Sequence, residues 1–271
     1  MMGRVFYNDN TEYVCKILDQ TIEEGNIPDG DIYWGDIQNI SGTTFKNYTS
    51  WHLFAGIGGM PAGLRMGGWP DEWPILTAGF PCQPVSNAGK RLAQADPRWL
   101  WPEAVRVLRV VRPPVILLEN TPGLLSRGMD DVLRDLAESG YHARWRVLAA
   151  ADVGAPHLRE RVWIVAYPDS QRYQGERSLR ERQFEIVGGG GTMAHADGIG
   201  LEKSRKYDAS PRNGAANTAT DTGWWEVEPS VGRVVDGLPN RVDRIKALGN
   251  AVVPQVVAAL VPWIVEGMPD D

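Results

Sequence analysis

Residues 50–66 read SWHLFAGIGGMPAGLRM and contain the feature that decides the fold. The apolar run at 50–54 predicts a buried strand, and the spacing of apolar residues from Met60 to Met66 predicts a helix. Three glycines lie between them, so a ligand can lie against the backbone at the helix N-terminus. The turn has neither the GxGxxG spacing of dinucleotide enzymes nor the lysine of a P-loop. S-adenosylmethionine is the remaining candidate ligand, and a tight turn without a ligand is the alternative.

Strand and helix patterns alternate along the chain, as expected for an α/β protein. Thr11 is expected to cap the first helix, and Leu248 to Asn250 are expected to form a loop before the last one. The periodicity is lost from about residue 168 to 217, which predicts one α/β domain with an irregular insert. Strands are predicted at 5–7, 32–37, 50–54, 75–78, 115–119, 143–149 and 161–167, and helices at 12–24, 60–66, 100–111, 130–139 and from Pro254.

The composition is that of an ordinary globular protein. Apolar residues make up 43% and charged residues 23% of the 271 residues, which excludes disordered and collagen-like classes. The net charge of 28 − 34 = −6 argues by itself against a polyanionic partner. Residues 1–50 hold 3 basic and 8 acidic residues, however, whereas residues 159–212 hold 10 basic and 8 acidic ones. The total charge therefore does not exclude nucleic acid as a partner.

Cysteine usage and hydropathy indicate the compartment. Two cysteines, Cys15 and Cys82, are too few for a disulfide framework, so a free thiol in a reducing compartment is expected. No apolar run approaches the roughly 18 residues of a membrane-spanning helix, and the N-terminus lacks the layout of a signal peptide. We expect a cytoplasmic protein with no membrane partner.

Cys82 lies in GFPCQPVS, directly after the predicted strand at 75–78. Ligands of parallel sheets bind at the carboxyl ends of the strands, and the prolines on either side of Cys82 restrict the local φ angles. A lone cysteine is usually an inert packing residue. In a loop of this kind it is a candidate nucleophile, because a thiolate with a lowered pKa reacts readily.

Glu119 ends the apolar strand VILLE. A carboxylate there is costly to bury unless it is protonated or paired, so Glu119 is a candidate acid or hydrogen-bond donor, with a salt-bridged surface residue as the alternative. Arg159 and Arg161 flank Glu160 and point to one face of a strand. Locally they fit either a solvated rim or a site for an anion or polar base.

Five motifs in order, FAGIGG, GFPCQPVS, ENTPGLL, RERVWIV and RIKALGNAVVP, resemble those of the DNA cytosine-5 methyltransferase family over residues 51–260. The resemblance implies that Cys82 attacks C6 of a flipped cytosine and that Glu119 bonds or protonates N3. It further implies that Arg161 contacts the base carbonyl, and that Arg159 and Asn120 organise the loop and the carboxylate. No metal is implied.

The sequence departs from the family before the catalytic loop. Only residues 60–80 separate the glycine turn from Pro81, which is too short for the two cofactor segments usually found there. They appear instead in residues 1–50, which implies a local circular permutation, with an unrelated acidic appendage as the alternative. Asp9 would then bind the ribose hydroxyls, and Asp36 the adenine amine. The cofactor residues implied are Phe54, Ala55, Gly56, Ile57, Gly58, Gly59, Asp9, Asn10, Asp36, Ile37, Pro81, Leu100, Asn250 and Ala251.

The fold expected is a Rossmann-like α/β sheet of the S-adenosylmethionine-dependent methyltransferase type, locally permuted, with a small irregular target-recognition lobe. Residues 1–167 would form the catalytic domain, 168–230 the target-recognition region, and 231–271 a segment returning to the catalytic domain. His52 and His157 stand where the family often has an acidic residue and a glutamine, and His52 is interpreted as a packing residue.

The partner expected is double-stranded DNA, methylated by a monomer of prokaryotic or phage origin. A cognate restriction endonuclease would act separately. A tRNA cytosine-5 methyltransferase and a non-catalytic DNA-binding relative are the alternatives that keep these motifs. A thiol oxidoreductase would require a CxxC motif, which is absent from the sequence.

Overall fold

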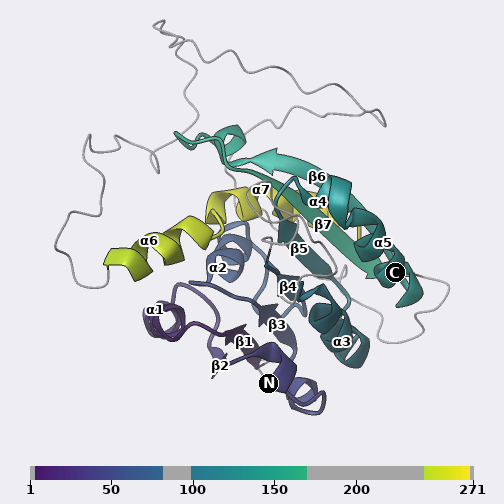
Figure 1. Cartoon of the computed structure of the whole chain (residues 1–271), viewed down its shortest axis with the longest axis horizontal. Helices are drawn as coiled ribbons and strands as arrows, with labels where there is room; N and C mark the ends of the chain where they lie inside the picture. The colour runs from purple at the N-terminus through teal and green to yellow at the C-terminus, as the bar shows by residue number, and fades with distance from the viewer. Residues whose placement is uncertain (1–3, 82–98, 170–240, 269–271) are drawn as a thin grey trace, which may run out of the picture.

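The computed structural model describes residues 4–81, 99–169 and 241–268, which form one mixed seven-stranded sheet in the order β2-β1-β3-β4-β5-β7-β6 (Figure 1). The first five strands in this order are parallel, and β7 runs antiparallel to both of its neighbours. The α/β prediction is therefore confirmed. The strands are β1 (Val5–Asp9), β2 (Gly30–Trp34), β3 (Ser50–Leu53), β4 (Leu76–Ala78), β5 (Ile116–Asn120), β6 (Tyr141–Ala149) and β7 (Glu160–Pro168).

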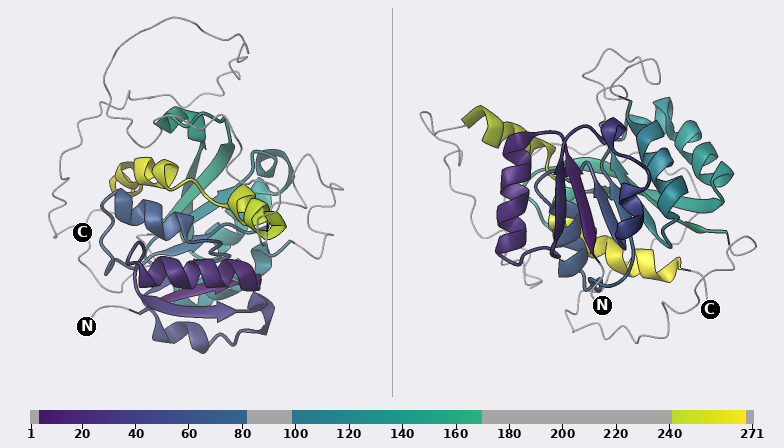
Figure 2. Two further views of the ribbon diagram at one scale, coloured as in Figure 1. Left: turned by 90° about the vertical axis from the view of Figure 1, so that its left-hand side faces the viewer. Right: turned by 90° about the horizontal axis from the view of Figure 1, so that it is seen from below.

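Helices cover both faces of the sheet (Figure 2). One face carries α3, α5 and the short turns after β2, which bury a core against alternate strand residues such as Phe6 and Leu118. The other face carries α1, α2 and α7. The helices are α1 (Glu12–Glu23), α2 (Gly59–Met66), α3 (Trp101–Val111), α4 (Leu124–Arg127), α5 (Met129–Glu138), α6 (Arg241–Asn250) and α7 (Pro254–Glu266), with short 3-10 turns η1 (Ile37–Asn39), η2 (Thr44–Asn47) and η4 (Ala150–Val153).

The N-terminal strands are part of the main sheet. β1 lies between β2 and β3, with Tyr7 opposite Ile32 on one side and His52 on the other. The first two strands of the chain therefore form one edge of the sheet, and β3, which leads into the glycine turn, lies further inside. Residues 4–50 are consequently not a separate appendage.

The C-terminal helix packs closely on the helix that follows the glycine turn. A Cβ atom at Gly63 of α2 would overlap the carbonyl oxygen of Pro254 and the side chain of Val257, so only glycine permits this approach. By length and composition, Lys246–Glu266 could cross a membrane. This stretch comprises the end of α6 and all of α7, separated at residues 251–253. Six apolar residues of α7 are buried in the core, which accounts for much of its hydropathy.

Three local predictions are wrong. Leu248 to Asn250 are not a loop, because they form the last turn of α6. The second strand ends at Trp34, since Asp36 caps a 3-10 turn. Thr11 does stand at the N-cap of α1, but its side chain makes no capping hydrogen bond and donates instead to the side chain of Asn10.

Candidate active site

The glycine turn joins β3 to α2 through three residues with positive φ. Phe54, Gly56 and Gly58 have φ values of 54°, 56° and 86°. This region is unfavourable for a bulky residue such as Phe54 and costs about 1–3 kcal/mol. Such strain occurs mainly where the surrounding structure fixes a functional conformation. Backbone bonds hold the turn, and one runs from the Ala55 amide to the Asn8 carbonyl oxygen at 2.8 Å.

A cavity of about 390 Å³ opens beside this turn. Its walls come from the glycine turn, the start of α2, the ends of β4 and β5, and the junction of α6 and α7. The lining residues are Leu53, Phe54, Ala55, Gly56, Ile57, Met60, Pro61, Thr77, Gly79, Glu119, Asn250, Ala251 and Val252. Six of the predicted cofactor residues are therefore in one cavity, although Asn250 and Ala251 lie about 190 residues after the glycine turn.

Asp9 touches the glycine turn from the end of β1. Its Oδ2 accepts a hydrogen bond from the Gly56 amide at 3.2 Å, and its Oδ1 accepts one from the Thr11 amide at 2.9 Å. Asn10, which follows it, is exposed. Asn8 is buried and donates to the Tyr33 and Gly35 carbonyl oxygens. The end of β1 is thus linked both to the glycine turn and to the end of β2.

The other predicted cofactor residues do not line this cavity. Asp36 is exposed, and its Oδ1 accepts the Gln38 amide at 3.0 Å; Ile37 behind it is buried. Leu100 is the N-cap residue of α3, and Pro81 is half-buried after β4. Gly58 caps α2 and Gly59 begins it.

Glu119 and Arg161 form a buried ion pair between neighbouring strands. Arg161 Nε lies 2.7 Å from Glu119 Oε1, with side-chain exposures of 20% and 13%. Burial raises the pKa of Glu119 above its ordinary value, although the positive charges of Arg161 and Arg159 oppose this shift. The carboxyl group therefore holds a proton more readily than an exposed glutamate does.

Glu119 also lines a second cavity of about 210 Å³ on the other side of its side chain, together with Arg159, Arg161, Trp163 and Val252. The two cavities share Glu119 and Val252. An ionisable carboxyl group thus stands between two adjoining cavities, and two arginines lie on one side of it.

The side chain of Arg159, just before β7, contacts the segment between α6 and α7, which contributes to the lining of both cavities. Its Nη1 donates to the Gly249 carbonyl oxygen at 2.9 Å and its Nη2 to that of Ala251 at 2.6 Å. Its φ of 32° is left-handed. The sequence left open whether Arg159 belongs to a solvated rim or to a site; in the structure its side chain holds the junction of α6 and α7.

Asn120 ties the end of β5 to the segment before Cys82. Its buried Nδ2 donates to the Phe80 carbonyl oxygen at 3.2 Å. Glu119 Oε2 lies close to Gly79, since a Cβ there would be 3.3 Å from it. Cys82 itself lies outside the described residues, but residues 79–81 that lead to it pass directly beside Glu119.

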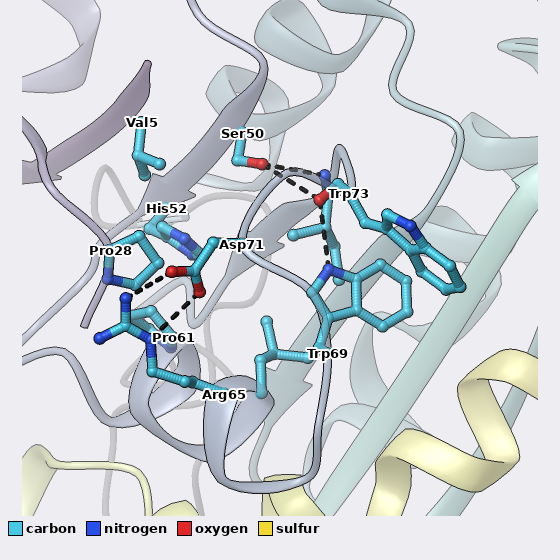
Figure 3. A pocket seen from close by; sticks show the side chains of 11 residues that line it. Val5, Pro28, Ser50, His52, Pro61, Arg65, Trp69, Asp71 and Trp73 are labelled. Atoms are coloured by element: carbon cyan, nitrogen blue, oxygen red, sulfur yellow. Dashed lines mark hydrogen bonds and ion pairs between the residues drawn. The ribbon is translucent and has the colours of Figure 1, made fainter. Parts of the chain in front are cut away.

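A third cavity, of about 280 Å³, lies at the opposite, amino-terminal edge of the sheet (Figure 3). Arg65 and Asp71 point toward one another there and form an ion pair. His52 is buried, stacks on Tyr7 at 5.1 Å, and places its Nδ1 2.8 Å from Thr77 Oγ1. Burial lowers the pKa of His52 to about 3, so its interpretation as a packing residue is confirmed.

Six residues of the main cavity were missed by sequence reasoning: Leu53, Met60, Pro61, Thr77, Gly79 and Val252. Leu53, Met60, Pro61 and Thr77 lie within predicted strands or helices, where the pattern indicates only burial. Gly79 stood in the quoted motif GFPCQPVS, and its glycine was the available signal.

Residues 68–188 match the family model of C-5 cytosine-specific DNA methylase. This range contains Glu119, Asn120, Arg159 and Arg161, which the structure brings together. The matched range begins after the glycine turn, so it includes neither that turn nor residues 1–50.

Curated relatives are Type II methyltransferases of bacteria. M.NgoMIV of Neisseria gonorrhoeae is 37% identical over 124 residues, covering 44% of this chain and 38% of the relative. M.NgoBI of the same species is 36% identical over 140 residues, covering 49% and 44%. M.NaeI of Lentzea aerocolonigenes is 42% identical over 96 residues, covering 34% and 23%. The matched part of this chain thus spans less than half of each of these relatives.

Likeness to solved structures is weaker. Dnmt2 methyltransferase of S. pombe aligns over 99% of this chain and 100% of its own, with 15% identity and a TM-score of 0.47.

Proposed function

We propose that this protein transfers a methyl group from S-adenosylmethionine to C5 of cytosine in double-stranded DNA. The observation that carries the proposal is the buried Glu119–Arg161 pair at the partition between two cavities, directly beside the segment that leads to Cys82. The matches to the cytosine-5 methylase model and to Type II methyltransferases support the same activity.

Two adjoining cavities are available for a cofactor and a base. The glycine turn, with its positive φ values, lines the larger one, where a ligand can lie against the backbone. The smaller cavity is lined by Glu119 and the two arginines, whose polar groups suit a polar ring. When bound, S-adenosylmethionine supplies an electrophilic methyl group.

The residues of this chain would activate the ring. The Cys82 thiolate adds to C6 of cytosine, which places electron density on C5 and N3. The raised pKa of Glu119 keeps a proton available for N3. Arg161, held at 2.7 Å from Glu119, stabilises negative charge on the base carbonyl. Transfer of the methyl group to C5 would leave S-adenosylhomocysteine. The C5 proton then leaves to solvent, the N3 proton returns to Glu119, and the Cys82 thiolate is eliminated, which restores the aromatic ring.

The arrangement of the N-terminal strands supports the proposed permutation. β1 lies next to β3 with β2 beyond it at the edge of the sheet, and Asp9 contacts the glycine turn. We assign Asp9 to the ribose hydroxyls and Asp36 to the adenine amine. Residues 168–230 would recognise the target sequence. A cytoplasmic role in restriction and modification, with a separate endonuclease and a monomeric enzyme, completes the proposal.

Bisulfite sequencing tests the activity. The full chain is expressed in a host that lacks DNA methylation, and its DNA is compared with DNA from a host expressing Cys82→Ser. We expect protected cytosines at one short sequence with the wild-type chain and none with the variant. Methylation that survives in Cys82→Ser would refute the covalent mechanism.

Two further measurements separate the alternatives. Methyl transfer to duplex DNA is compared with transfer to tRNA, and transfer to tRNA alone would contradict the DNA assignment. DNA carrying 5-fluorocytosine should form a covalent adduct with the wild-type chain, because the fluorine cannot leave as the C5 proton does. Specific DNA binding without an adduct would indicate a non-catalytic DNA-binding protein.

A further inference from the structure

Arg106 of α3 holds two backbone carbonyl groups of the turn that follows β2. Its Nη2 donates to the Ile37 carbonyl oxygen at 2.8 Å and its Nη1 to that of Ile40 at 3.0 Å. Its Nε donates to Glu103 Oε2 at 2.7 Å, and its guanidinium carbon lies 5.8 Å from the centre of the Phe45 ring. All three nitrogens of the guanidinium group are therefore bonded.

This arrangement depends on the shape of arginine. A planar guanidinium presents several donors at fixed angles, whereas a lysine ammonium is a compact charge on a flexible stem. Ile37 is the first residue of η1 and Ile40 is its C-cap. By holding both ends, the guanidinium of Arg106 fixes η1 as a unit against α3, across a separation of 66 to 69 residues in sequence.

The position of η1 determines the position of one exposed carboxylate. Asp36 is the N-cap of η1, and its Oδ1 accepts the Gln38 amide at 3.0 Å. We propose that Arg106 is a positioning residue for the purine end of the cofactor site, and that it acts through η1 on Asp36. The inference rests on the proposed function, in which Asp36 accepts a hydrogen bond from the adenine amine.

The rest of α3 is consistent with this role. Leu100, another proposed cofactor residue, is the N-cap of the same helix. Ile37, Ile40 and the α3 residue Ala104 are buried in one core. The start of α3 and the η1 turn thus form one packed unit around the proposed purine position, and Arg106 is the polar link within it.

Calorimetric titration of the full chain with S-adenosylmethionine tests the proposal. Arg106→Lys keeps the charge but loses the planar group, so we expect cofactor binding about tenfold weaker and an unchanged kcat at saturating cofactor. Arg109→Lys on the same helix is the matched control, because Arg109 contacts Ser139 instead and should bind cofactor normally. Asp36→Ala should also weaken binding. If Arg106 acts through Asp36, the double variant should bind no more weakly than Asp36→Ala alone.

Other outcomes would overturn the proposal. Normal binding by Arg106→Lys, or losses that add in the double variant, would show that Arg106 does not act through Asp36. A parallel loss of kcat and thermal stability would indicate a merely structural role. Should Arg106→Lys fail to fold, Glu103→Gln provides a milder perturbation and is expected to weaken cofactor binding without changing kcat. Wild-type protein that binds no S-adenosylmethionine would contradict the proposed function itself, whereas normal wild-type binding with an unaffected Arg106→Lys contradicts only the positioning role.

Discussion

Replacement of Gly79 by alanine should impair turnover without unfolding the protein. The new Cβ would lie 3.3 Å from Met60 Cε and 3.3 Å from Glu119 Oε2. Met60 can rotate its terminal methyl group away, because methionine is unbranched and flexible. Glu119 is less free to move, since its other oxygen is held 2.7 Å from Arg161 Nε. The carboxyl group must therefore shift by a few tenths of an ångström away from residue 79, which disturbs its hydrogen bond to Arg161.

The size of the effect follows from this displaced hydrogen bond. A hydrogen bond between charged groups contributes about 1.5–3 kcal/mol. Loss of roughly 1 kcal/mol of that interaction in the transition state lowers kcat about fivefold. Because both contacts are with the ends of side chains, and not with backbone, we expect little change in the melting temperature.

The assay is transfer of labelled methyl groups to duplex DNA at saturating S-adenosylmethionine, with the melting temperature measured in parallel. Gly42→Ala is the matched control, because a Cβ at Gly42 would meet Val110 at an ordinary distance of 3.4 Å. A wild-type kcat in Gly79→Ala would refute the argument that Glu119 must keep this position. So would a large fall in melting temperature, since the loss of rate would then reflect unfolding.

Three further predictions follow from burial and packing. Because the pKa of Glu119 is raised, kcat should fall with increasing pH as this group loses its proton, and a pH profile of Glu119→Gln should lack that falling limb. Burial lowers the pKa of His52 to about 3 in the folded protein. Between about pH 6.5 and this value, the imidazole of His52 is protonated in the unfolded chain but not in the folded one. Stability should therefore decrease as pH falls through this window, by at most about 1.4 kcal/mol per pH unit, and urea denaturation of His52→Asn should show a weaker dependence. Gly63→Val should reduce the free energy of unfolding by about 1–3 kcal/mol, because its side chain would overlap Pro254 and Val257; an unchanged urea midpoint would contradict the close packing of α2 on α7.

Local patterns were sufficient for most of the fold. Most residues of β1, β3, β4, β5 and β7 are buried, so these strands read as apolar runs, whereas β2 and β6 at the two edges of the sheet are partly exposed. The glycine turn was evident from its spacing. The end of β2 was misjudged because Ile37 is apolar and continues the run. Its burial comes from a 3-10 turn packed on α3, and no local pattern distinguishes that turn from a strand.

The candidate site was predicted less completely. Glu119 and Arg161 could be assigned to one site only through the family resemblance, since their contact depends on the pairing of β5 with β7. The contacts of Arg106 and Arg159 were not predictable, because each joins segments more than 60 residues apart through backbone carbonyl groups. Every residue type has a backbone carbonyl group, so the sequence does not indicate which residue accepts the hydrogen bond of the arginine.

The structure also shows how residues that precede the glycine turn in the chain can lie beside it. β1 is held in place by backbone pairing with β3, by the bonds of Asn8 to the end of β2, and by the bond between Asp9 and Gly56. Arg106 adds a link from α3 to the turn that follows β2. All of these contacts are non-covalent and depend on where the strand lies in the sheet. They are independent of the order in which the strands are connected, so a rearranged chain can keep the same site as long as the sheet is continuous.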